Sequence, residues 1–167
     1  MNSAQLLTDG FGRVPDTTFA AMENLSVDQL AYRIDGRGNS IAWLVWHLTR
    51  TQDDHVSDVA GVEQVWTSGG WFERFALPFQ PEATGFGQSA DDVASVRVDA
   101  RLLKGYLSEV HRRTLDYVAT LSDDDLDRVV DESWDPPVTL GVRLVSVISD
   151  DLQHAAQAAF IRGLILD

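Results

Sequence analysis

Two apolar segments of this chain carry polar side chains, and both have the spacing of helices. The first segment, residues 40–48, reads SIAWLVWHL and contains His47. The second, residues 148–156, reads ISDDLQHAA and contains Asp150 and His154. Asp150 and His154 are four residues apart, so they share one face of a helix. If the two helices pack together, two imidazoles and one carboxylate meet in one pocket. That set of donor atoms suits a divalent metal.

Apolar residues recur at helical spacing in four long segments, which are 3–23, 41–59, 101–121 and 139–166. Gly10, Gly12 and Pro15 predict a kink or a broken turn in the first of them. No segment has a convincing strand pattern. We therefore predict an all-α protein, an antiparallel four-helix bundle, forming a single domain over residues 1–167.

Shorter helices and one long connection are expected between the four main helices. Ser26 is placed to cap a short turn over residues 25–30, and Ser40 is a cap candidate for the second long helix. Residues 89–92, Ser-Ala-Asp-Asp, resemble a capping box. The stretch 61–90 is rich in glycine and aromatic residues. We interpret it as an irregular aromatic loop with a short helix near Trp71, and its aromatic content argues against disorder.

The charge balance limits the partners of the protein. Its formal net charge is −13, from 26 acidic and 13 basic residues. This argues against nucleic acid, which is bound through clustered lysine and arginine, and against an anionic membrane surface. No apolar run reaches the ~18 residues of a membrane span, and the first residues do not read as a signal peptide. We expect a cytoplasmic protein with a small-molecule substrate.

The chain contains no cysteine. Disulfides, zinc sites with cysteine ligands and catalysis by a thiol of the chain are therefore excluded. Any thiol chemistry needs a thiol from outside.

The order of these features resembles the DinB-like family of four-helix bundles, which includes mycothiol-dependent maleylpyruvate isomerases and related thiol transferases. The matching pieces are Leu25-Ser26 before a short helix, residues 39–48, and the last helix with Asp150, His154, Arg162 and Gly163. In that family one metal ligand is a histidine near the start of the second helix. Two more come from the last helix at positions i and i+4. The resemblance thus implies His47, Asp150 and His154 as metal ligands.

Asp150 departs from the family pattern, which has histidine or glutamate at that position. Aspartate is one methylene shorter than glutamate, so Asp150 would bind a metal from a closer backbone or through water. Its alternatives are a solvated charge and an ion pair with Arg143. Asp151 lies about 100° around the helix and is less well placed. For His47 the alternative is a buried imidazole bonded to a backbone carbonyl.

Three further residues are candidates for the site. Asp54 lies seven residues after His47 on nearly the same helix face, as a catalytic carboxylate or a surface acid. Trp46 is the candidate for an aromatic contact with substrate or cofactor. Gln157 lies one turn beyond His154 and is a second cofactor-binding candidate.

Of the two remaining histidines, His111 is expected at the surface and His55, which projects away from His47, is not expected to have a role in the site. The run Ala155–Ala159 indicates close helix packing, inside the bundle or at a dimer contact. Together with the family resemblance it predicts a homodimer.

We predict from these features an enzyme that binds a divalent metal, Zn²⁺ or alternatively Ni²⁺, and a low-molecular-weight thiol. The resemblance implies mycothiol or a similar thiol, held as a thiolate for S-transfer to a small electrophile or for its isomerisation. The same ligands would serve a metal-dependent hydrolase. A third possibility is a non-enzymatic bundle that binds a small molecule or a partner and has a weak metal site.

Overall fold

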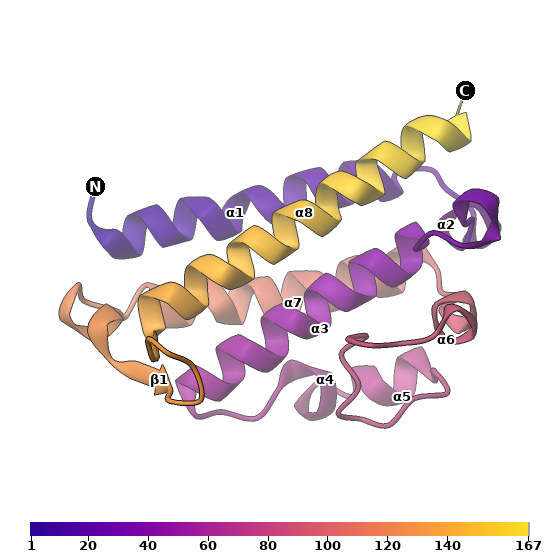
Figure 1. The fold of residues 1–167 in the computed structure, drawn as a ribbon. Coiled ribbons are helices and arrows are strands. Elements are labelled where there is room, and N and C mark those ends of the chain that lie inside the picture. Colours follow the sequence, from indigo (N-terminus) through magenta and orange to yellow (C-terminus); the bar gives the residue numbers. More distant parts are fainter. Residues whose placement is uncertain (167) are drawn as a thin grey trace.

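The computed structural model describes residues 1–166 and is dominated by four long helices (Figure 1). These are α1 (Ser3–Met22), α3 (Ile41–Ala60), α7 (Ala100–Val118) and α8 (Leu140–Leu166). The predicted all-α bundle is confirmed, and each helix ends within a few residues of its predicted bounds. None of the helices among residues 1–166 combines the length and apolar character needed to cross a membrane.

The four helices form a square in which α8 and α7 each pack against both α1 and α3. In Figure 1, α1 and α8 run from left to right, whereas α3 and α7 run back from right to left. The bundle therefore has two helices in each direction. Helices α3 and α7 share a direction because the long connection between them returns along the bundle before α7 begins.

The predicted break in α1 does not occur, since the helix is continuous from Ser3 to Met22. Gly10 faces the neighbouring helix: a Cβ atom there would lie 3.0 Å from Ile148 of α8. The glycine thus lets α1 approach α8 closely. Pro15 is buried in the bundle, where packing of the flanking turns supports the helix in spite of the missing backbone donor.

Short elements fill the connections. They are α2 (Val27–Leu30), η1 (Ile34–Gly36), α4 (Val65–Ser68), α5 (Trp71–Phe75), α6 (Ala90–Ser95) and η2 (Asp124–Asp127). The predicted caps are confirmed. The side chains of Ser26, Ser40 and Ser89 each accept a backbone hydrogen bond at the start of α2, α3 and α6, respectively.

A small antiparallel hairpin corrects the expectation of no strand. It consists of β1 (Val129–Asp131) and β2 (Val138–Thr139), with Val129 paired to Thr139 and Asp131 to Val138. Strands of two and three residues are too short for alternation to be visible in the sequence. The hairpin leads directly into α8 and brings Asp131 beside that helix.

Aromatic packing orders the long connection between α3 and α7. Trp66 lies 5.1 Å from Phe75 and 5.1 Å from Tyr106 of α7, measured between ring centroids. The indole nitrogen of Trp71 donates to Glu109 of α7 over 2.7 Å. These buried rings fasten α4 and α5 to the outer side of α3 and α7, and the following residues return toward α3.

Candidate metal centre

His47, Asp150 and His154 converge between α3 and α8. Each offers one ligand atom, and these atoms lie within 4.8 Å of one another. The two imidazole centroids are 4.9 Å apart, and His154 Nε2 lies 3.6 Å from Asp150 Oδ1. The structure thus brings together the three residues that the sequence singled out, in a cluster able to hold a metal ion.

The position of His47 follows from the local structure of α3. Ser40 caps the helix by accepting from the backbone N–H of Trp43. Trp43 is one turn before His47 and stacks on its ring, with centroids 4.6 Å apart and an interplanar angle of 22°. The indole of Trp43 in turn donates to Gln88 over 2.7 Å. The imidazole is therefore held against a ring that is itself fixed.

The connection between α5 and α6 fixes the proton on His47. His47 Nδ1 lies 2.5 Å from the carbonyl oxygen of Thr84. A carbonyl can only accept, so Nδ1 carries the proton and Nε2 keeps its lone pair. Such a bond from the other ring nitrogen typically orients a metal-binding histidine.

Gly85 allows this close approach of the backbone to His47. A Cβ atom at position 85 would lie 2.7 Å from His47 Nδ1 and 3.1 Å from the Trp43 ring. Its φ of +102° also belongs to the region that favours glycine. Glycine is therefore required here for both conformation and space.

His154 is oriented in the same manner by its own helix. Its Nδ1 lies 3.1 Å from Gln157 Oε1, so the ring donates to the amide oxygen and Nε2 is left with a lone pair. Gln157 was predicted to bind a cofactor. The structure places it against the imidazole instead, at an exposed position of α8.

The carboxylate of Asp150 shows whether a cation fits between the two imidazoles. Its Oδ2 atom is buried and has no hydrogen-bond partner among residues 1–166. Buried carboxylate oxygens almost always have a donor or a cation. An unpartnered oxygen next to two imidazole nitrogens with free lone pairs fits a divalent metal with two histidines and one carboxylate.

Electrostatics also favour a neutral, ligand-competent imidazole at position 47. Burial lowers the pKa of His47, and the hydrogen bond to Thr84 only partly opposes this effect. The ring is therefore unprotonated at Nε2 near neutral pH. Protonation at that atom would prevent metal binding.

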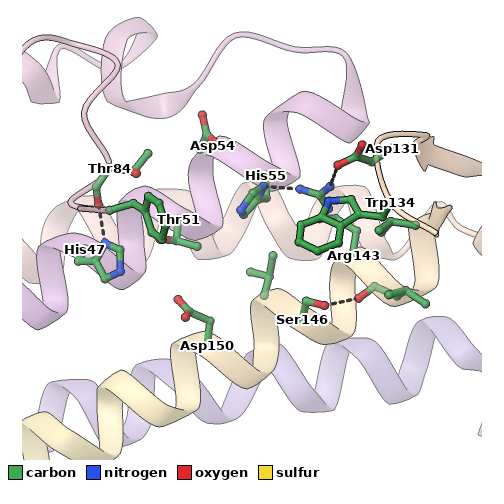
Figure 2. Close-up of a pocket in the computed structure, with 14 residues that line it drawn as sticks. His47, Thr51, Asp54, His55, Thr84, Asp131, Trp134, Arg143, Ser146 and Asp150 are labelled. Carbon is green, nitrogen blue, oxygen red and sulfur yellow. Dashed lines mark hydrogen bonds and ion pairs between the residues drawn. The ribbon is translucent and has the colours of Figure 1, made fainter. Parts of the chain in front are cut away.

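A cavity of about 530 Å³ lies along α3 and α8. His47 and Asp150 form one end, and Asp131, Arg143 and His55 form the other (Figure 2). The apolar wall comes from Phe86, Trp134, Val138, Val142 and Val147. Two of the three candidate metal donors, His47 and Asp150, thus face a space large enough for a small molecule.

Three predictions about neighbouring residues need correction. Trp46 is completely buried, packs on Phe79 at 5.3 Å and does not line the cavity. Trp43 is the aromatic residue at the cluster, because contact along a helix follows a spacing of four rather than one. His55, which was not expected to have a role in the site, lines the cavity. His111 is also only partly exposed, and its Nδ1 is buried.

Asp54 lines the cavity but lies about two turns along α3 from His47. Its Oδ1 accepts from Gln64 over 2.7 Å. It is not a member of the cluster. Asp150 is not the ion-pair partner of Arg143, which pairs with Asp131 at 3.0 Å. Asp151 points into the bundle, where complete burial raises its carboxyl pKa well above the usual value.

Sequence reasoning missed a buried arginine that holds the segment before Thr84. Arg50 has no exposed surface. Its Nε donates to the carbonyl of Ala83 over 3.0 Å, and Nη2 donates to that of Pro81 over 3.4 Å. Arg50 therefore fastens the segment whose next carbonyl orients His47. The signal was present as an arginine on the apolar side of a helix.

Asp53 completes this network one turn further along α3. Its carboxylate accepts from the backbone N–H groups of Val65 and Trp66, over 2.9 and 2.7 Å, and from the hydroxyl of Tyr106 over 2.7 Å. Arg50 Nη1 lies 3.7 Å from the same carboxylate. The pair ties α3 to α4 and α7.

Four helices with two histidines and a carboxylate between them define a helical bundle with a metal-type donor set. The chain matches the family model of the DinB superfamily over residues 11–158 and belongs to that superfamily. The resemblance noted from the sequence is thereby confirmed.

One similar solved structure is the crystal structure of a conserved protein from Enterococcus faecalis. It is 30% identical, with a TM-score of 0.93, and the match covers 99% of this chain and 98% of that chain. A search of curated proteins finds no match. The fold is thus shared over nearly the full length of both chains.

Proposed function

We propose that this protein is a metal-dependent enzyme that uses an external low-molecular-weight thiol to act on a small electrophile, by S-transfer or isomerisation. One observation carries the proposal. Two imidazoles donate from Nδ1 to protein acceptors, Thr84 and Gln157, which leaves the lone pair of each Nε2 for a ligand. Both rings lie beside the carboxylate of Asp150, whose Oδ2 has no hydrogen-bond partner within the described residues 1–166. Three protein ligands leave coordination positions for a further molecule.

His47, Asp150 and His154 would hold the ion, with Zn²⁺ proposed and Ni²⁺ as the alternative. A bound ion of this kind lowers the pKa of a thiol and keeps it as a thiolate near neutral pH. The protein's own part is to fix both rings and to shape the cavity for the electrophile. Because the chain has no cysteine, the nucleophilic sulfur comes from a small molecule, for which we propose mycothiol or a similar thiol.

The position of Asp54 favours this chemistry over hydrolysis. A hydrolase needs a general base within hydrogen-bond reach of the attacking water. Asp54 lies two turns from His47 and is engaged by Gln64, so it does not serve as a base at the cluster. We further propose a cytoplasmic homodimer, on the alanine-rich stretch of α8 and the family resemblance.

Metal and thiol binding test the proposal directly. Protein purified without chelator or affinity tag should contain about one zinc or nickel ion per chain, and His47→Ala should remove it. Cobalt-substituted protein should develop a sulfur-to-cobalt charge-transfer band when a thiol is added. Protein without bound metal would favour a non-enzymatic bundle. Turnover that does not depend on thiol would favour a hydrolase.

A further inference from the structure

A second polar cluster lies at the end of the cavity away from His47 and Asp150. Its centre is Arg143 of α8, whose side chain is only 18% exposed. Arg143 Nη2 donates to Asp131 Oδ2 over 3.0 Å, and Nη1 lies 2.8 Å from His55 Nδ1 (Figure 2). The guanidinium is therefore held in place by the hairpin on one side and by α3 on the other.

This cluster has hydrogen-bond donors to spare. A guanidinium carries five N–H donors and no acceptor. Two of them serve Asp131 and His55, which leaves three without a partner among residues 1–166. Since arginine can only donate, His55 Nδ1 accepts, and the proton of this imidazole is on Nε2. Burial and the adjacent guanidinium lower the pKa of His55, in agreement with a neutral ring.

The neighbouring carboxylate of Asp131 is already supplied with donors. Besides Arg143 it accepts from the backbone N–H and the hydroxyl of Ser133, over 3.0 and 2.6 Å. Asp131 therefore acts as a support that orients the guanidinium. A fixed guanidinium with free N–H groups matches the geometry of a carboxylate.

The distance between the two ends of the cavity, at Arg143 and at Asp150, limits the length of the ligand. Arg143 and Asp150 are seven residues apart on α8, which corresponds to about 10.5 Å along the helix axis. The wall between them is apolar and includes Val147. At the rim, Trp134 and Phe86 are 66% and 93% exposed and can cover an apolar body.

We propose that Arg143, together with Nε2–H of His55, binds a carboxylate group of the substrate about two helical turns from the metal donors. The substrate class is a small organic acid whose electrophilic carbon is separated from the carboxylate by a short apolar portion. This inference rests on the proposed function for the identity of the reactive end. The carboxylate subsite itself depends only on Arg143 and its surroundings.

The alternative is that this end of the cavity prefers a cationic group over a carboxylate, and the experiment must distinguish the two. Asp54 also lines this end of the cavity, and a cationic group on the substrate would be drawn to it. Its carboxylate accepts from Gln64, whereas three N–H donors of Arg143 have no partner among residues 1–166. The sign of the preferred charge therefore decides between the two residues.

Three six-carbon thiols measure that sign in cobalt-substituted protein. They are 6-mercaptohexanoate, 6-mercaptohexan-1-ol and 6-aminohexane-1-thiol, titrated by the sulfur-to-cobalt band. We expect the carboxylate to bind about 10-fold more tightly than the alcohol, and the amine no more tightly than the alcohol, since one charge-assisted bond of about 1.4 kcal/mol gives that factor. Equal affinities, or tightest binding of the amine, would overturn the subsite.

Two variants and a short pair of probes provide the controls. Arg143→Gln should remove the preference for the carboxylate, whereas Asp131→Asn should keep or increase it. Affinity ratios within each variant cancel any general loss of folded protein. The shorter 3-mercaptopropionate and 3-mercaptopropan-1-ol cannot span the cavity, so their ratio should be the same in wild type and Arg143→Gln.

A further titration without thiol tests the carboxylate subsite independently of the proposed function. Hexanoate and hexan-1-ol are titrated into metal-free protein by calorimetry, in wild type and Arg143→Gln. If no thiol gives a cobalt band but hexanoate binds in an Arg143-dependent manner, the proposed function fails and the subsite stands. If the bands form without preference for the carboxylate, the subsite fails and the function stands. If no probe binds at all, both are overturned.

Discussion

Helix α3 carries two buried ionisable clusters one turn apart, and they use their hydrogen-bonding atoms differently. In the network of Arg50 and Asp53, each side-chain nitrogen and oxygen has a partner. In the cluster around His47, both imidazoles keep an Nε2 atom without a hydrogen bond and Asp150 keeps an unpartnered oxygen, as far as residues 1–166 are concerned. The first cluster is complete within the protein, and the second is open to the cavity.

The contrast shows that burial of a charged or polar group does not by itself indicate chemistry. A fully partnered buried pair has a structural role. Removal of one partner leaves the other charge buried and uncompensated, which lowers the stability of the fold. Unpartnered donor atoms that also face a cavity, as at Asp150, indicate a ligand, whereas the unpartnered oxygens of Asp151 are fully buried away from the cavity. The two clusters should therefore respond to mutation in opposite ways, one through stability and the other through metal binding.

The largest effect is expected for Arg50→Met. It leaves Asp53 buried without its cation and releases the carbonyls of Pro81 and Ala83, so the free energy of unfolding should fall by about 3–5 kcal/mol. Urea denaturation measures the change. Arg101→Met is the control, because the side chain of Arg101 is 94% exposed and a surface pair contributes little. A loss below about 1 kcal/mol for Arg50→Met would contradict a structural role.

His47→Ala should show the reverse pattern. Removal of one of three ligands should weaken metal affinity by roughly 100-fold or more, because even loss of a supporting contact costs 10–100-fold. Asp150→Ala should weaken it less, and His111→Ala should leave it unchanged. Competition with a chromophoric chelator gives the affinities. If His47→Ala keeps full metal affinity, the cluster is not a metal site.

Gly85→Ala sharpens the comparison because it acts on His47 through the backbone. The added Cβ would displace the Thr84 carbonyl from the ring, so metal affinity should fall by about 10-fold. Gly87→Ala is the matched control, since it also has a positive φ, +73°, but nothing within 4 Å of its Cβ. Gly87→Ala should lose about 1 kcal/mol of stability and Gly85→Ala more than that, because its Cβ also meets His47 and Trp43, and only Gly85→Ala should lose metal affinity. Equal metal affinities of Gly85→Ala and Gly87→Ala would contradict the role of the Thr84 carbonyl in orienting His47.

The smallest effect concerns pH and histidines that have no metal role. Burial lowers the pKa of His111 and of His55 below 6.5 in the folded protein. Between the folded pKa and 6.5 the unfolded chain binds more protons, so the stability of the metal-free protein should decrease as pH falls through this window. His111→Leu should flatten the dependence, measured by urea denaturation between pH 7 and 5. Identical slopes in the two proteins would show that His111 does not contribute.

Part of the candidate ligand set was predictable from local helix geometry, because the i, i+4 spacing places Asp150 and His154 on one face in any helix. His47 was conspicuous as a histidine within an apolar run, but its interpretation as the third ligand came from the resemblance to the DinB-like family. Trp46 was misassigned because it is the neighbour of His47 in sequence, whereas the residue that contacts His47 along the helix is Trp43, four positions earlier. The four main helices were equally visible in the hydrophobic spacing.

The contact that orients His154 is local, since Gln157 lies three residues away on α8. For His47 the sequence offered a backbone carbonyl as an alternative partner, but which carbonyl accepts was not predictable, because the contact joins segments distant in sequence. The Thr84 carbonyl reaches His47 only through the path of an irregular segment fastened by Arg50. Neither periodicity nor residue type reports such a path. The same holds for His55, whose place at the cavity depends on Arg143 of α8.

The division of the candidate ligands between α3 and α8 would have a consequence for the protein in the cell if the cluster binds metal as proposed. Because α8 is synthesised after the other long helices, a chain still on the ribosome without α8 has one imidazole of the cluster and lacks the other two donors. All three candidate donors could then hold an ion only after the bundle has closed. Metal at 100 times its dissociation constant would add about 2.7 kcal/mol to the folded state, and this would act on the junction of α3 and α8. Metal supply would thereby set resistance to proteolysis, so that a cell starved of the ion would lose the protein as well as its activity.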